Sequence, residues 1–185
     1  MDEESATFEE GRELIRVVRA DERRICLDNG IELEMPCKGE ISSYLEFLDR
    51  IMAVLYVFDK KRCDWRRNIF CWRKEDGELL WQVERARRPS GVECEGVYKL
   101  LRLEVKQPDG EYRHDGDIEI DESLPEEIVG KRYLKPFRRG EHRLVAETLE
   151  DLGCVVEVDY ETGRVRPLGE LDRWGMRLPP DWGER

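Results

Sequence analysis

The sequence contains no apolar run approaching the roughly 20 residues that a membrane-spanning helix requires. Its longest such run, Ile51–Phe58, has only the length of a strand. The N-terminal residues Met1–Glu4 are acidic, whereas a secretory signal begins with basic residues and continues with an apolar stretch. These absences predict a cytoplasmic protein that does not bind membranes.

Histidine is scarce, and no two cysteines have the Cys-x-x-Cys spacing of zinc and redox sites. The two histidines, His114 and His142, lie away from any cysteine pair. We therefore expect no metal and no cofactor. In a reducing cytoplasm the six cysteines are expected to stay unpaired and to act as small buried hydrophobes. Three of them lie inside apolar runs: Cys26, Cys71 and Cys154.

Acidic residues outnumber basic ones by 43 to 32, which gives a formal net charge of -11. A surface with this balance repels nucleic-acid phosphates and anionic lipid at long range. The acidic excess can serve solubility alone. As a recognition feature it favours a basic partner protein, and it predicts that the chain binds no nucleic acid.

Short alternating runs of apolar residues, separated by turn residues, indicate a mainly β fold. Asn29-Gly30 and Asp76-Gly77 each separate two such runs and predict tight hairpins, because these residues tolerate positive φ. In the second hairpin, Trp72 and Trp81 are expected to pair across the two arms in the core. The uninterrupted run Ile51–Phe58 predicts a central strand that is buried on both faces.

The second half of the chain has the same pattern of strands and turns. Val97–Val105 alternates cleanly, and residues 143–149, 154–159 and 164–166 predict a three-stranded meander, with a helix over 143–152 as the alternative. Ser43–Glu46 has the spacing of a capping box and could begin one helical turn. The alternative is that Tyr44–Leu48 is already extended. We expect a mainly β fold: a twisted antiparallel meander, a small sandwich or a partial roll, with at most one or two short helices.

The chain shows no repeat at the roughly 40–45 residues of a propeller blade, so a propeller is excluded. We expect one β-rich domain over residues 13–166. An acidic segment without periodicity, residues 1–12, precedes it and is expected to be disordered. A tail that contains prolines and tryptophans, residues 167–185, follows it.

A carboxylate stands at every second position in one stretch: Asp115, Asp117, Glu119 and Asp121. On a strand these side chains would share one face and could hold a hard cation such as calcium. The glycine and the bidentate glutamate of an EF-hand are absent at the required offsets. A solvated edge strand that resists aggregation is therefore favoured, and the same acids are candidates for contact with a basic partner.

Two other clusters are weaker candidates. His114 beside Asp115 could activate a cysteine for nucleophilic catalysis, but nothing in the sequence positions the two together. Basic residues around Trp65 could grip single-stranded nucleic acid, but the net charge and the neighbouring acids oppose this. The basic set comprises Lys60, Lys61, Arg62, Arg66 and Arg67, with Arg85, Arg87 and Arg88 after the second hairpin.

Trp174 and Trp182 lie in the C-terminal tail among prolines. Tryptophan is enriched among the residues that carry most of the binding energy at protein interfaces. These two side chains are therefore candidate anchors for a partner. The alternative is that they pin the tail to the rest of the domain.

The segments Phe47–Leu55, Arg67–Phe70 and Asp76–Val83 resemble a group of small uncharacterised bacterial β-rich proteins. These proteins share an Arg-Asn-Ile-Phe motif and an Asp-Gly-x-Leu-Leu-Trp-Gln hairpin. Glu157–Val165 is similar to their Glu-Val-Asp-Pro-x-Thr-Gly ending, with Tyr160 where proline is usual; the charged insert 84–96 is a second departure. Some members look like immunity proteins of bacterial toxin systems. The resemblance implies a β fold and a binding role, and it supplies no catalytic residues.

Three functions are compatible with these observations. The favoured one is a non-catalytic, immunity-like domain that binds a basic protein through its acidic surface, where electrostatic steering would speed association. The second is an accessory or structural subunit of a larger assembly. The third is a small-ligand-binding domain or an enzyme with a pocket between its sheets.

Overall fold

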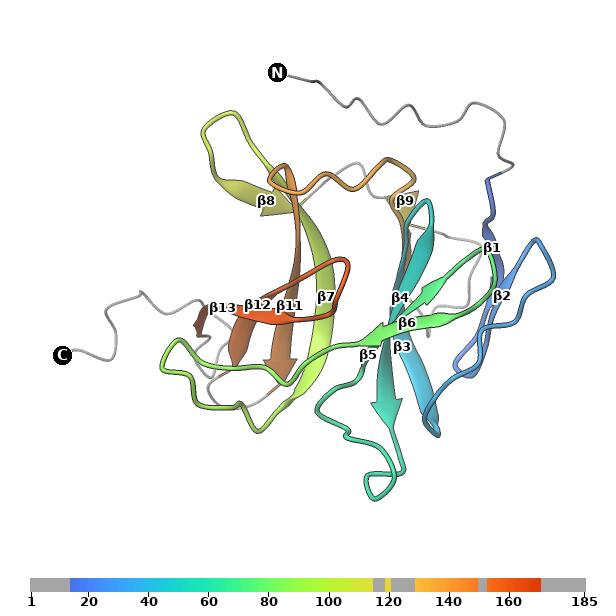
Figure 1. Ribbon diagram of the computed structural model, residues 1–185, viewed down its shortest axis with the longest axis horizontal. Helices are drawn as coiled ribbons and strands as arrows, with labels where there is room; N and C mark the ends of the chain where they lie inside the picture. Colours follow the sequence, from blue (N-terminus) through green and yellow to red (C-terminus); the bar gives the residue numbers. More distant parts are fainter. Residues whose placement is uncertain (1–13, 115–118, 121–128, 150–152, 171–185) are drawn as a thin grey trace.

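The computed structural model describes residues 14–114, 119–120, 129–149 and 153–170. Over these residues it contains strands, turns and loops and no helix, which confirms the mainly β fold class. Figure 1 shows three layers side by side: a five-stranded sheet, a six-stranded sheet, and the hairpin of β1 (Val17–Ala20) and β2 (Ile25–Leu27).

The six-stranded sheet forms the middle layer, with the order β6-β5-β4-β3-β10-β9. Its neighbouring strands are antiparallel except β3 and β10, which run parallel. The strands are β3 (Gly39–Glu46), β4 (Arg50–Val57), β5 (Ile69–Arg73), β6 (Leu79–Gln82), β9 (Glu119–Ile120) and β10 (Val129–Arg132).

Strand β4 lies inside this sheet and is buried on both faces, as its uninterrupted apolar sequence predicted. Ile51 and Leu55 face the β1–β2 layer, whereas Met52 and Val54 face the five-stranded sheet. The helical alternative for Ser43–Glu46 is wrong, because these residues pair with β4 on one side and with β10 on the other.

The five-stranded sheet is antiparallel, with the order β13-β12-β11-β7-β8. The predicted C-terminal meander is confirmed, and the helical alternative is wrong over residues 142–149. The last strand continues to Glu170, into the segment expected to form the tail. The strands are β7 (Val97–Lys106), β8 (Tyr112–His114), β11 (His142–Leu149), β12 (Cys154–Val158) and β13 (Val165–Glu170).

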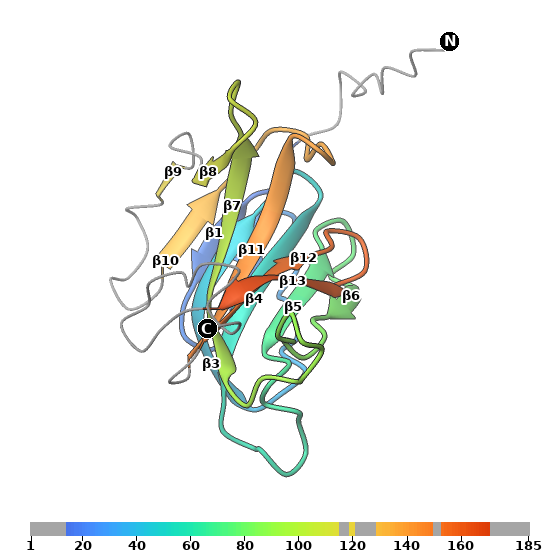
Figure 2. The same cartoon turned by 90° about the vertical axis from the view of Figure 1, so that its left-hand side faces the viewer.

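Two apolar cores separate the three layers, and Figure 2 looks onto the five-stranded sheet, with the other two layers behind it. The first core lies between the two large sheets and includes Met52, Leu103 and Leu144. The second lies between the six-stranded sheet and the β1–β2 hairpin and includes Ile25 and Ile51. The middle sheet is therefore apolar on both faces, which explains why β4 has no polar break.

Both predicted turns are present. Gly30 and Gly77 adopt φ of +84° and +73°, the left-handed region that favours glycine. Beyond Gly30 the returning arm makes one bridge, between Cys26 and Glu32. The expected pairing of Trp72 with Trp81 is wrong: Trp72 opposes Leu79 and enters the second core, whereas Trp81 enters the first.

Four of the six cysteines form disulfides, Cys37–Cys63 and Cys94–Cys154, so the expectation that all six stay unpaired is wrong. Sequence spacing could not show this, because the partners are 26 and 60 residues apart and only the packed sheets bring them together. Cys26 and Cys71 remain as free thiols. Burial raises the pKa of the Cys71 thiol well above its ordinary value, so this side chain behaves as the small hydrophobe that the sequence suggested.

Replacing Gly163 by alanine is expected to destabilise the fold through both strain and a clash. Gly163 has φ of +69°, and an added Cβ would lie 2.6 Å from Trp81 Cε3. Gly110→Ala is the matched control, because Gly110 has φ of +87° but no atom within 4 Å of the added Cβ. The control should cost about 1 kcal/mol through strain alone, and Gly163→Ala about 1–3 kcal/mol more. Equal losses in denaturant unfolding would contradict the contact with Trp81.

Candidate functional site

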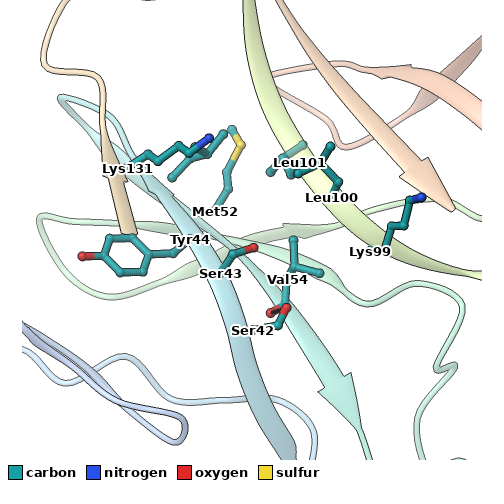
Figure 3. A pocket seen from close by; sticks show the side chains of 10 residues that line it. Ser42, Ser43, Tyr44, Met52, Val54, Lys99, Leu100, Leu101 and Lys131 are labelled. Carbon is teal, nitrogen blue, oxygen red and sulfur yellow. Dashed lines mark hydrogen bonds between the residues drawn. The ribbon is translucent and has the colours of Figure 1, made fainter. Parts of the chain in front are cut away.

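A cleft of about 220 Å³ opens where β3, β4 and β10 of the six-stranded sheet face β7 of the five-stranded sheet (Figure 3). Its floor is buried and apolar, and its rim carries exposed or half-buried serine and lysine side chains. The floor is formed by Leu45, Met52, Val54 and Leu101, and the rim by Ser42, Ser43, Lys99, Leu100 and Lys131.

Two β-bulges shape this cleft from opposite sides. The pairing of β3 with β4 skips Ser42, and the pairing of β7 with β11 skips Lys99. A bulged residue bends its strand and redirects a side chain, and bulges are frequent beside binding sites. The Ser42 hydroxyl donates a hydrogen bond to the Val54 carbonyl oxygen at 3.0 Å, which holds the bulge against β4.

Tyr44 also borders the cleft, but its ring points to the other side of β3 (Figure 3). There the ring covers Gly130 of β10: an added Cβ at Gly130 would lie 2.4 Å from Tyr44 Oη. The absence of a side chain at Gly130 thus lets β10 pack beside β3 and carry Lys131 to the rim.

Two exposed aromatic side chains lie next to the cleft in the sequence, after its lining residue Val54 of β4. Tyr56 and Phe58 follow Val54 at every second position, so they point to the same side of the strand. Their exposed fractions are 60% and 48%, and their ring centroids lie 5.6 Å apart at an interplanar angle of 72°. Glu40 of β3 lies opposite Tyr56 in the ladder. We call Tyr56 and Phe58 the aromatic ledge.

The loop after the ledge carries the basic residues that the sequence singled out. The Cys37–Cys63 disulfide ties this loop to the segment before β3, and Lys60 Nζ lies 4.6 Å from the centre of the Trp65 ring. Most of the arginines are engaged within the protein. Arg67 donates to the Val83 carbonyl, Arg85 pairs with Asp64, and Arg88 pairs with Glu170.

The Arg67–Phe70 and Asp76–Val83 segments supply side chains that join the two large sheets. Asn68 donates to the carbonyl oxygens of Leu55 and Tyr98, both at 2.8 Å, and accepts from the Tyr98 amide at 2.9 Å. Trp81 Nε1 donates to the Tyr160 carbonyl at 3.1 Å. Because these side chains are saturated by backbone groups in the interior, they hold the fold and are not placed to meet a ligand.

Tyr160, which replaces the usual proline of that motif, lies in an aromatic and charged cluster between the sheets. The Tyr160 ring stacks on the Phe137 ring, with the two ring centroids 4.1 Å apart. The Arg50 guanidinium also packs on the Tyr160 ring, 4.0 Å from its centre. Its hydroxyl donates to Asp49 at 2.7 Å. Burial would raise the pKa of Asp49, but hydrogen bonds from Arg50 and Tyr160 outweigh it and hold that pKa below its ordinary value. Burial raises the pKa of Tyr160.

The outer face of the five-stranded sheet is charged, and its charges compensate one another. Arg143 and Arg102 both pair with Glu104, at 2.6 Å and 3.0 Å, and Arg102 also pairs with Glu147. Burial would raise the pKa of Glu104, but its hydrogen bonds to the two arginines keep it lowered. These ion pairs neutralise one another, and Val145, which alternates with Arg143 and Glu147, forms a small buried apolar cluster with Val155 and Leu168 on the same face.

Most of the site residues proposed from the sequence lie outside the described residues: Asp115, Asp117, Asp121, Trp174 and Trp182. Glu119 is in β9, whose backbone pairs with β10 at the end of the six-stranded sheet. That placement agrees with the edge strand expected for this stretch. Among these residues, only Glu119 lies in the described part of the chain, and it does not line the cleft.

The two histidines have structural partners. His114 is in β8, with Nδ1 3.3 Å from the Leu103 carbonyl oxygen. His142 Nδ1 accepts from the Arg138 amide at 2.8 Å, so the ring proton is on Nε2, which lies 2.6 Å from Tyr133 Oη. Over the described residues, no group of three or more histidine, cysteine, aspartate or glutamate side chains is arranged to hold a metal ion.

Two features of the sequence mark the positions where the cleft forms. In Val97–Val105, Lys99 occupies a position of the alternating series that is otherwise apolar, next to Leu101 and Leu103. A lysine in such a series marks a bulge or a site. Two adjacent serines between Ile41 and Tyr44 are the corresponding sign on β3.

The described residues contain no helix that could cross a membrane. Comparisons of the chain with protein-family models, with curated proteins and with solved structures gave no match.

Proposed function

We propose that this chain is a non-catalytic protein-binding domain that contacts its partner through the cleft and the aromatic ledge. The cleft carries the proposal, because it has an apolar floor and two exposed aromatic side chains follow on the same side of β4, which supplies Val54 to its lining. Exposed aromatics beside a small apolar pocket are typical of the anchoring regions of protein interfaces. The resemblance of its motifs to a group of small β-rich proteins, some of which look like immunity proteins, supports the same class of function.

The size of the cleft favours a protein partner over a small ligand. Pockets that enclose drug-sized molecules occupy roughly 300–1,000 Å³, and this cleft has about 220 Å³. It therefore has room for one inserted side chain, while the ledge supplies further apolar contact. Its lining carries serine hydroxyl and lysine amino groups but no histidine, aspartate or glutamate side chain, and the proposal is therefore one of binding.

Photocrosslinking from the ledge tests this function. The photoreactive residue p-benzoylphenylalanine replaces Tyr56 in one variant and Val92 in a control, because both side chains are 60% exposed. In a lysate of the source organism the Tyr56 probe should capture a defined protein that the Val92 probe does not. Ser43→Phe, which fills the cleft, should abolish that capture while leaving thermal unfolding intact. Identical capture from both positions would refute the function.

A second candidate surface favours the basic partner expected from the net charge. The turns at Asn29 and Gly77 contact each other, since Asn29 donates to the Lys74 carbonyl at 3.1 Å. Together they carry six exposed acids: Asp28, Glu32, Glu34, Glu75, Asp76 and Glu78. An immunity-like protein could meet a basic toxin here. Asp28→Lys combined with Glu75→Lys should then abolish partner capture, whereas Ser43→Phe should leave it unchanged.

The proposed cytoplasmic location has to accommodate two disulfides. Disulfides are rare in the cytosol of most organisms but common in intracellular proteins of hyperthermophiles. Such proteins are rich in ion pairs and poor in asparagine and glutamine. This chain is 41% charged and has two asparagines and two glutamines. If the protein is cytoplasmic, we therefore expect its source organism to grow at high temperature.

A further inference from the structure

We infer that the cleft accepts an acidic segment of the partner protein, with one bulky apolar side chain inserted on the floor between Met52 and Leu101. This inference rests on the proposed function, and it adds the chemistry of the segment that is bound. It follows from the volume and lining of the cleft, from the charges at its rim and from the geometry of the ledge.

The rim selects negative charge. Lys99 and Lys131 lie on opposite sides of the opening, and neither has an ion-pair partner among the described residues. Their two ammonium groups therefore give the opening a local positive charge beside its apolar floor, in a protein whose net charge is -11. On β3, Glu40 lies opposite Tyr56 in the ladder, and it does not line the cleft. Carboxylates that flank an inserted side chain would therefore meet the lysines.

The floor selects an apolar side chain. Met52, Val54 and Leu101 are buried in the first core, with exposed fractions of 5% or less. An apolar side chain inserted against them loses its own contact with water, which favours binding in proportion to the apolar area removed. The cleft is too small for a folded element, and a single leucine or phenylalanine side chain fits the space that the two bulges open.

Nucleic acid fits this surface less well, although lysines and aromatics are both present. Base stacking requires ring faces on which successive bases can lie. Tyr56 and Phe58 meet edge to face, at 72°, so they do not offer two parallel faces. The cleft floor is aliphatic rather than aromatic, and the net charge of the chain repels a phosphate backbone.

Titration of the full-length, ¹⁵N-labelled protein with defined probes tests the inference. The probes are the N-acetylated peptide amide Asp-Glu-Phe-Asp-Glu, its analogue with alanine for phenylalanine, the basic peptide Lys-Arg-Phe-Lys-Arg, and a ten-residue oligothymidylate. The first peptide should shift the amide resonances of Ser43, Val54 and Leu101. The alanine analogue should bind about tenfold more weakly, because the floor is left uncovered.

Charge-reversed variants supply the matched control. Lys99→Glu combined with Lys131→Glu should weaken the acidic peptide by about tenfold or more. Lys61→Glu combined with Lys106→Glu makes the same change in net charge at exposed lysines outside the rim, and it should leave affinity within about twofold. Ser43→Phe should prevent the shifts in a protein that still unfolds cooperatively.

Three results would overturn the inference: equal or tighter binding of the basic peptide, binding of the oligothymidylate that the rim variant abolishes, or self-association of the chain that Ser43→Phe abolishes. Each would assign the cleft to a different occupant. If the Tyr56 probe captured a defined protein that binds through a basic segment, the proposed function would stand, but the inference of an acidic segment would be refuted. If the Tyr56 probe captured no defined protein and the acidic peptide shifted no resonance, both the proposed function and this inference would be refuted.

Discussion

Lys74→Met is expected to lower the free energy of unfolding by about 3 kcal/mol, because it leaves a buried carboxylate without one of its cations. Glu46 and Lys74 have exposed fractions of 0% and 1%, and their charged atoms lie 2.9 Å apart. The effect should fall at the lower end of the range for broken buried pairs, since Arg132 still reaches Glu46 at 2.8 Å. Urea unfolding followed by tryptophan fluorescence measures it.

The position of this pair explains why its loss should be global. Glu46 also accepts from the Val17 amide at 3.0 Å, and Lys74 donates to the Phe47 carbonyl at 2.9 Å. One carboxylate thus connects β1, β3, β10 and the turn after β5. Charged groups so deeply buried are tolerated only when every partner is in place.

Two variants control this result. Lys106→Met removes an exposed lysine and should change stability by no more than about 0.5 kcal/mol. Glu46→Gln combined with Lys74→Met removes both formal charges, so it should cost less than the two single substitutions together. A Lys74→Met protein as stable as the Lys106→Met protein would show that the pair does not hold the layers.

Removing the Cys94–Cys154 disulfide is expected to destabilise the protein by about 4 kcal/mol in the chain-entropy description of cross-links. The bond closes a loop of 60 residues and ties the segment before β7 to the first residue of β12. Replacing both cysteines by alanine relaxes that restraint on the unfolded chain. Guanidinium unfolding without reductant compares the variant with the natural sequence.

The same experiment in reductant separates the cross-link from the packing. Once reduced, the natural protein and the double variant should differ only by the small loss of two sulfur atoms from the core. Thiol titration of the denatured, unreduced protein should count two thiols, Cys26 and Cys71, and the count should rise to six after reduction. Six thiols before reduction would contradict both disulfides.

The local structure of this protein was determined by its sequence. The Asn-Gly and Asp-Gly turns, the buried β4 and the C-terminal meander follow from backbone preferences and from alternation of apolar side chains, which act over a few residues. The fold class was therefore predictable from short windows. Two segments fitted either a helix or a strand from local sequence alone: Ser43–Glu46 and residues 143–149. Both are strands because they pair with strands from distant parts of the chain, β10 and β7. Such pairing satisfies the hydrogen-bonding groups of the backbone.

Only the tertiary structure decided which distant residues meet. The parallel pairing of β10 with β3 brings Lys131 to the cleft, the bulges at Ser42 and Lys99 open it, and the packed sheets bring Cys94 to Cys154 and Lys74 to Glu46. Lys99 and the two serines interrupt the local apolar pattern, but which elements meet depends on the relative position of separate strands, and no short window of sequence specifies that. The candidate site is assembled from three such contacts, which is why alternation and turn residues predicted the sheets but not the cleft between them.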